Sequence, residues 1–238
     1  MQERNLTLLF LITLLAILTL YPLIDTGFTN NDDMRTELTA YFRDWNSEIK
    51  LIQEGGRINR LIGWLLPLSV VPYLFDHPVY FQAFRLGAPM ALLLTLGWLL
   101  HRLYRSFTLA ALPAIFFLAF IQNNWEHNLL TSYPLTFNGL FTLFMLALIS
   151  FTKALETKKL RYAILGSLLY FLTLSYEGFF LYGIVFFLLW WSYSAHSDQL
   201  VPTRFKIFLL SVIGIFIGYL SIYLAWRYLY PPSIEQYG

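Results

Sequence analysis

The stretch LIGWLLPLSVVPYLF at residues 61–75 decides the fold, because it is apolar but is interrupted by Pro67 and Pro72. A transmembrane helix needs roughly 20 predominantly apolar residues. A shorter run that contains prolines is typical of a segment that dips into the bilayer or lies at its surface. Whether this run crosses determines on which side of the membrane each later loop lies.

Seven other apolar runs have the length of a membrane span, and they lie near 6–24, 79–101, 106–122, 134–152, 160–176, 178–194 and 206–229. As a single helix, the nearly unbroken run 160–194 would be about 50 Å long, too long for a hydrocarbon core of about 30 Å. We therefore expect a tight hairpin at Ser175-Tyr176-Glu177-Gly178. The first run is longer than a signal-peptide core and lacks a cleavage site, so we expect a retained span.

Composition supports a membrane protein. The chain is 58% hydrophobic and 13% charged, with a mean hydropathy of +0.58, whereas a soluble domain has roughly 25% charged residues. The net charge of +2 predicts no nucleic-acid partner, and the absence of cysteine excludes disulfides and thiol nucleophiles. The sequence predicts an all-α polytopic protein with seven transmembrane helices in one membrane domain, residues 1–238.

The distribution of Lys and Arg favours a run 61–75 that does not cross. In that case Arg4 and the basic loops at 101–105, 153–161 and 204–206 share one side. The other side has the connections 76–78, 123–133 and 175–178 and the tail 230–238, which lack Lys and Arg. This arrangement obeys the positive-inside rule, and a crossing at 61–75 would break it. We therefore expect a cytoplasmic N-terminus and a first outer loop over 25–78.

This outer loop is unusually acidic. Half of the chain's 14 acidic residues lie in it, namely Asp25, Asp32, Asp33, Glu37, Asp44, Glu48 and Glu54. Apolar residues recur at helical spacing over 34–54, so we expect an amphipathic helix at the outer interface. Gly55-Gly56 would end this helix before the short re-entrant or juxtamembrane segment 61–75.

Asp32 and Asp33 are the first candidate site. One of them can cap the following helix, and acidic groups favour that end of the helix dipole. The functional alternative is a general base, or a ligand for a divalent cation such as Mg²⁺ or Mn²⁺, at the mouth of a membrane cavity.

Arg57, Arg60 and Arg85 form a second group of candidates. Arginines near a membrane surface often extend their guanidinium groups to the headgroups, which is the structural interpretation. Guanidinium groups also match phosphate oxygens in bidentate geometry, so the three arginines suit a lipid phosphate.

The outer connections supply three further candidates. Glu126 and His127 belong either to a solvated loop or to substrate recognition, and their spacing is a weak metal signal. Glu177 in the short hairpin needs a partner, because an unpaired charge near the hydrocarbon is costly. That partner is either a structural arginine or a substrate.

The layout of the chain resembles that of the GT-C superfamily, integral-membrane glycosyltransferases that use polyprenyl-phosphate-linked sugars. The matching features are Asp32-Asp33 after a first span, Gly56-Arg57 before the short run 61–75, and Ala83-Phe84-Arg85-Leu86 in the second span. Asn31-Asp32-Asp33-x-Arg35 followed by Gly56-Arg57 also looks like bacterial glucosyltransferases that modify surface polysaccharides. Most such enzymes are considerably longer, so by this resemblance the chain would be a fragment such as their N-terminal membrane module, a minimal module, or a protein that needs a partner.

The resemblance implies an inverting sugar transfer on the outer face of a bacterial plasma (inner) membrane. By the resemblance, Asp32 or Asp33 would be the base, and Arg57 with Arg85 would hold the donor phosphate. The further candidates for binding substrate are Arg35, Arg60, Glu126, His127 and Glu177. The partners would be a polyprenyl-phosphate-sugar donor, a glycan, lipid or protein acceptor, and membrane lipids. Two alternatives stay open: a transporter or flippase for lipid-linked or small solutes, and a non-catalytic membrane subunit.

Overall fold

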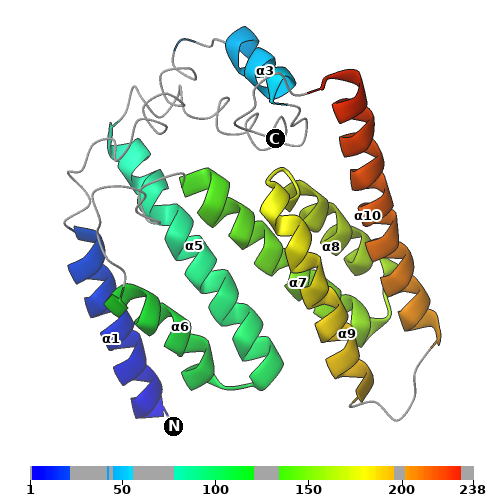
Figure 1. Cartoon of the computed structure of the whole chain (residues 1–238). Coiled ribbons are helices and arrows are strands. Elements are labelled where there is room, and N and C mark those ends of the chain that lie inside the picture. Colours follow the sequence, from blue (N-terminus) through cyan, green and yellow to red (C-terminus); the bar gives the residue numbers. More distant parts are fainter. Residues whose placement is uncertain are drawn as a thin grey trace. The chain divides into compact units, whose positions relative to one another are not determined.

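The structure is a computed structural model that describes residues 2–21, 42, 45–55, 78–120, 134–195 and 202–231. Within these residues every regular element is a helix, as the sequence predicts (Figure 1). In chain order the elements are α1 (Gln2–Leu20), α3 (Trp45–Glu54), α5 (Pro78–Tyr104), α6 (Phe107–Phe120), the π-helix η2 (Pro134–Gly139), α7 (Leu140–Thr157), α8 (Leu160–Thr173), the 3₁₀-helix η3 (Glu177–Gly183), α9 (Ile184–Ala195) and α10 (Pro202–Leu229).

Three of the described helical segments are long and apolar enough to cross a membrane by length and composition: Leu86–Tyr104, Phe137–Thr157 and Val212–Leu229. Shorter apolar helices cover Asn5–Thr19, Phe107–Phe120, Leu160–Thr173 and Gly178–Ser192. Each of the seven expected spans therefore contains an apolar helix. Spanning length within the described residues is reached in three of them, and the count of seven spans stays a prediction.

Several hydroxyl groups on these helices are satisfied locally. Thr13, Thr95 and Ser150 each donate to the carbonyl oxygen four residues earlier, over 2.8–2.9 Å. Such a bond keeps a polar side chain compatible with apolar surroundings, because it needs neither water nor a neighbouring helix.

The chain folds as two compact units. Unit 1 comprises residues 1–42 and 70–145, and unit 2 comprises 43–69 and 146–238. The expected single membrane domain stays a prediction.

Unit 1 contains α1, α5 and α6. The Thr19 hydroxyl, near the end of α1, donates to the Leu118 carbonyl, near the end of α6, over 2.9 Å, so these two helices finish at the same end of the unit. α5 and α6 form an antiparallel hairpin, because a Cβ at Gly97 would lie 3.1 Å from the Ala110 carbonyl oxygen across the turn. The chain therefore leaves α1 and enters α5 at the same end of unit 1 (Figure 1).

Unit 2 has its core around α7, α8 and α9. A Cβ at Gly166 would lie 2.8 Å from Phe151 Cδ2 and 3.2 Å from the Ala147 carbonyl oxygen, so α7 and α8 pack as a close antiparallel pair. Fully buried side chains fill the space between the helices, and they include Phe151, Tyr170 and Phe186. α10 contacts α8 along this core.

The expected amphipathic helix 34–54 is confirmed over α3, and its residues 34–41, 43 and 44 lie outside the described residues. Ile52 is buried on α3, while Lys50 and Glu54 pair at 3.7 Å on its exposed side. Its expected place at a membrane interface stays a prediction.

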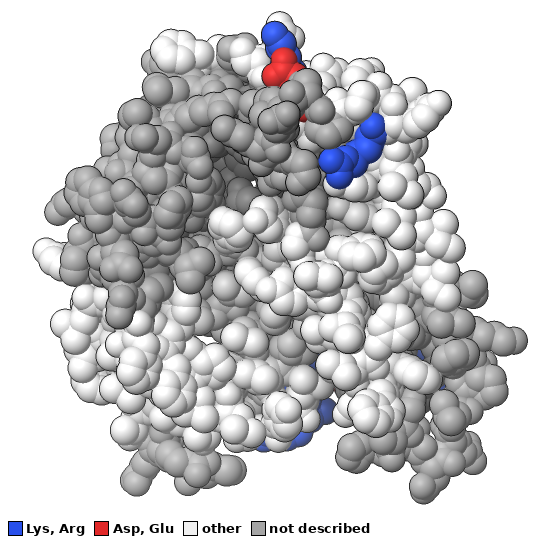
Figure 2. Space-filling model, viewed as in Figure 1, with Lys and Arg blue, Asp and Glu red and all other residues white. Residues whose placement is uncertain are grey.

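The outer faces of the helices carry large apolar side chains. Leu168 on α8, Trp191 on α9 and Leu224 on α10 are each more than half exposed. On the face shown in Figure 2, the described surface is mostly uncharged, with a few charged groups near its edges. Soluble monomers rarely expose so much apolar area, so these faces suit a lipid or protein environment.

Candidate functional site

Most of the site residues that the sequence singles out lie outside the described residues: Asp32, Asp33, Arg35, Arg57, Arg60, Glu126 and His127. Arg85 lies in the second turn of α5, and Glu177 is the first residue of η3, but their side chains are not among those described. The described helices that precede or follow these residues in the chain show where the segments that carry them begin and end.

In unit 1, α1 and α6 finish near each other, and the antiparallel α5 starts toward the same end of the unit. The segment with Asp32 and Asp33 follows α1 directly, the loop with Glu126 and His127 follows α6, and Arg85 is seven residues beyond the start of α5. The hydrogen bond from Thr19 to Leu118 brings the ends of α1 and α6 together, and the close approach of Gly97 to Ala110 sets the antiparallel direction of α5.

Unit 1 also contains a π-helix, η2. η2 packs against α5, and Asn138 within it is only 3% exposed. The Asn138 carbonyl accepts a hydrogen bond from the Thr142 hydroxyl over 2.7 Å, which ties η2 to α7. π-turns are rare and often occur at functional sites, and a buried amide is a polar group that the apolar run 134–152 did not signal.

In unit 2, the expected break at residues 175–178 is confirmed, although α9 begins only at Ile184. The amides of Leu174, Ser175 and Tyr176 bond to carbonyls three residues earlier, over 3.1–3.3 Å, and these tight turns end α8. The Phe179 amide then bonds to the Tyr176 carbonyl over 3.1 Å and opens η3. Glu177 therefore lies where one helix has ended and a 3₁₀-helix begins.

Tyr170 fixes the position of η3. Its side chain is fully buried, and its hydroxyl lies 3.2 Å from the Phe179 carbonyl oxygen and 3.3 Å from that of Phe180. The hydroxyl therefore donates to backbone carbonyls within η3. Phe186 packs edge-on against the Tyr170 ring with the ring centroids 4.8 Å apart.

Gly183 allows η3 to approach α8 and α10 closely. A Cβ at this position would lie 2.7 Å from the Tyr170 hydroxyl oxygen and would clash with the ring of Phe216. No other residue type fits this position without a shift of these two packed rings.

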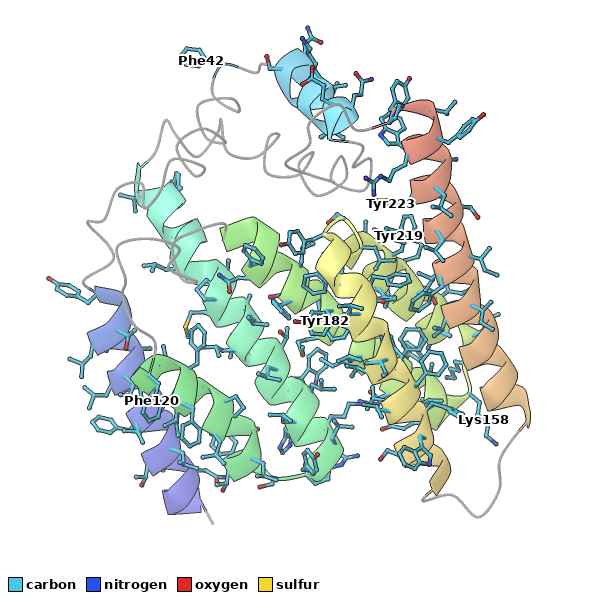
Figure 3. The ribbon with its side chains drawn as sticks, in the orientation of Figure 1. Phe42, Phe120, Lys158, Tyr182, Tyr219 and Tyr223 are labelled. Atoms are coloured by element: carbon cyan, nitrogen blue, oxygen red, sulfur yellow. The ribbon has the colours of Figure 1, made fainter. Side chains whose placement is uncertain are left out.

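A column of aromatic rings leads from η3 along α10 (Figure 3). Phe180 stacks on Tyr219 with the centroids 5.8 Å apart, and Tyr219 stacks on Tyr223 at 5.9 Å. Arg227 follows one turn later, with Nη1 3.3 Å from the Tyr223 hydroxyl oxygen and Cζ 5.8 Å from the Tyr223 ring centroid.

Arg227 is a charged residue that the sequence reasoning missed, because it was counted as part of the apolar run 206–229. The available signal was an arginine one turn after Tyr223 in the otherwise uncharged stretch 207–229. At the last turn of α10 its charge favours the negative end of the helix dipole. A guanidinium group and tyrosine hydroxyls at this end of unit 2 can also bind an anion or sugar hydroxyls.

Among the described residues, no group of three or more His, Asp or Glu side chains is arranged to hold a metal ion. The chain matches no known protein family, no curated protein and no solved structure.

Proposed function

We propose that the protein is a polytopic membrane glycosyltransferase that moves a sugar from a polyprenyl-phosphate donor to a glycan, lipid or protein acceptor. In this proposal seven helices span a bacterial inner membrane, the N-terminus is cytoplasmic, and residues 25–78 form an outer loop with interfacial helices. The resemblance of the chain's layout to the GT-C superfamily suggests the reaction.

The observation that carries the proposal is the common end of α1, α5 and α6 in unit 1. Because the chain leaves α1 and enters α5 at that end, the intervening residues need no net crossing of the membrane. This supports a re-entrant run 61–75, which enters the membrane and returns to the same side. It also supports a shared compartment for Asp32, Asp33, Glu126 and His127, as a single active site on the outer face requires.

The proposed reaction is a displacement at the anomeric carbon. Asp32 or Asp33 takes the proton of the acceptor hydroxyl, whose oxygen forms a new bond to the anomeric carbon on the face opposite the phosphate. The bond from the anomeric carbon to the phosphate oxygen breaks with inversion, and the lipid phosphate leaves with the electron pair. Arg57, assisted by Arg60 and Arg85, neutralises the charge that develops on this phosphate.

The remaining candidates bind the substrate. Arg35 contacts the donor next to the aspartates, and Glu126 and His127 bind hydroxyl groups of the sugar or acceptor. Glu177, at the start of η3, lies at the end of unit 2 that carries the aromatic column and Arg227. Aromatic rings and carboxylates are groups that can bind sugar rings and their hydroxyl groups.

The test is sugar transfer by the full chain in proteoliposomes, with a short-chain polyprenyl-phosphate-glucose donor and lipid-embedded acceptor from bacterial envelopes. We expect Asp32→Asn with Asp33→Asn to lower transfer by roughly 10²–10⁴-fold, the usual contribution of a general base. Glu54→Gln removes an acid from the same loop that is paired with Lys50 on α3, and it should leave transfer unchanged. Full activity of the double variant would refute the assignment of the base.

A further inference from the structure

Two basic residues occupy a backbone conformation that normally selects glycine. Arg105 has φ of 53° and Lys158 has φ of 58°, and among the described residues these are the only non-glycine positions with positive φ. Each follows the last residue of a helix, and each amide bonds to the carbonyl four residues earlier, over 2.8 Å for Arg105 and 2.9 Å for Lys158.

Glycine is the usual residue at this position, because an L side chain in the left-handed region costs about 1 kcal/mol. A lysine at position 158 therefore lowers the stability of the turn between α7 and α8. Strain of this kind is commonly retained where the side chain serves another purpose. At position 158 that purpose would be to project a cationic side chain from the turn.

The turn between α7 and α8 gathers further cations around one ring. Lys153 Nζ lies 4.6 Å from the Tyr162 ring centroid, and Arg161 Cζ lies 4.9 Å from it. Arg161 Nη2 also donates to the Tyr162 hydroxyl over 3.2 Å. Two positive groups are thereby held near each other, an arrangement that an anion between them would stabilise.

The net charge of this turn is strongly positive. Residues 153–161 contain four cations (Lys153, Lys158, Lys159 and Arg161) and one acid (Glu156), a net charge of +4 − 1 = +3. Lys158, Lys159 and Arg161 are exposed. Lys158 lies at the opposite end of unit 2 from Tyr219 and Tyr223 (Figure 3).

An exposed apolar strip continues directly from these cations along α8. Its members are 47–58% exposed, namely Leu160, Ile164, Leu165 and Leu168. A ligand that covers both features must carry an anionic head next to a hydrocarbon chain. Inorganic phosphate alone would leave the apolar strip uncovered.

We propose that the turn between α7 and α8 is a binding site for one anionic phospholipid. Its headgroup phosphate lies among Lys153, Lys158 and Arg161 beside the Tyr162 ring, and its acyl chains lie along the exposed strip of α8. The proposal rests on the membrane residence that the proposed function includes, and it is independent of the sugar transfer. It places the lipid at the end of unit 2 remote from Glu177.

The test uses the full chain in nanodiscs of phosphatidylcholine that contain increasing fractions of phosphatidylglycerol. Native mass spectrometry of the released protein counts retained phosphatidylglycerol. Each cation near a membrane surface contributes roughly a fivefold change in affinity. We therefore expect Lys153→Gln with Arg161→Gln to weaken retention roughly 25-fold. Lys158→Arg, which keeps the charge, should retain the lipid as the unmodified protein does.

Lys158→Gly separates lipid binding from folding. It removes the left-handed strain together with the charge, so thermal stability in pure phosphatidylcholine should rise or stay constant while lipid retention falls roughly fivefold. Arg105→Gly is the matched control, because it removes a charge and the same backbone strain at the turn between α5 and α6. It should change retention less than about twofold, because it leaves the cations around Tyr162 in place.

Three results would overturn the proposal. Undiminished retention in Lys153→Gln with Arg161→Gln would show that the cations do not hold the lipid. An equal loss in Arg105→Gly would assign the effect to the general charge of the basic turns. Displacement of the lipid by millimolar inorganic phosphate would identify a free-anion site instead. None of these measurements uses a sugar donor, so their failure leaves the test of Asp32 and Asp33 unaffected.

Discussion

The two ends of α8 are built from opposite chemistry. At its start, the connection to α7 exposes Lys158, Lys159 and Arg161. At its end, Tyr170, Thr173 and Leu174 are buried, and the Tyr170 hydroxyl bonds to carbonyls of η3. At the first end charged side chains are exposed, and at the second end polar groups are buried in an aromatic core.

The two ends also differ in where glycine occurs. Gly183 occurs where two packed rings leave no room for a Cβ, whereas Lys158 occurs where the backbone itself favours glycine. The aromatic end is therefore specified by packing. The basic end carries a cationic residue although its backbone conformation is strained for any residue other than glycine.

The largest expected effect concerns the sides of the membrane that the two ends face. The chain has no cysteine, so Lys158→Cys and Tyr176→Cys each introduce a single thiol. We expect an impermeant maleimide to label position 158 only in inside-out vesicles and position 176 only in right-side-out vesicles. Labelling of both positions from one side would remove the distinction and refute the proposed topology. Lys50→Cys should label with position 176.

The next effect tests the aromatic core. Phe186 is fully buried against Phe151 and Tyr170, with ring centroids 4.7 and 4.8 Å away, whereas its neighbour Phe187 is 40% exposed. We expect Phe186→Ala to lower the free energy of unfolding by about 3–5 kcal/mol through the cavity that it leaves. Phe187→Ala is the matched control and should cost much less. Unfolding by SDS titration measures both, and equal losses would contradict the description of the core.

The smallest effect tests the close approach of η3. Gly183→Ala should lower the free energy of unfolding by about 1–3 kcal/mol, because the new Cβ forces Tyr170 and Phe216 to shift. At Gly214 on α10 a Cβ would meet no neighbouring atom of the described residues within 4 Å, so Gly214→Ala should stabilise the helix by about 0.5–1 kcal/mol. The same titration distinguishes the two signs, and a neutral Gly183→Ala would show that the rings adapt freely.

Much of the fold could be predicted from hydrophobic periodicity and length. The expected helices at 79–101, 134–152 and 206–229 correspond to α5, to η2 with α7, and to α10, and the break at Ser175 and Tyr176 occurs where excessive helix length required it. The 3₁₀-helix η3 could not be predicted, because residues 178–183 are as apolar as the helix that follows. Its conformation depends on Tyr170 and Gly183, which are distant from one another in sequence.

Some residues of the candidate site could likewise be found from the sequence, and others could not. Asp32, Asp33, Arg57 and Glu177 stand out in the sequence because charges are scarce in an apolar chain. Arg227 was missed because it lies within the apolar run 206–229, and its contact with Tyr223 is known only from the structure. Asn138 was missed because a lone amide in an apolar run carries no signal until its burial is known.

The amino-acid sequence by itself determined the helical class and the positions of most apolar helices, because helix formation and burial follow from local periodicity and composition. Only the tertiary structure decided that α1 and α6 finish together, that η3 is held by the Tyr170 hydroxyl, and that Lys153 and Arg161 meet at one ring. Those features depend on contacts between residues far apart in the chain or across a turn, and local sequence does not encode such distances.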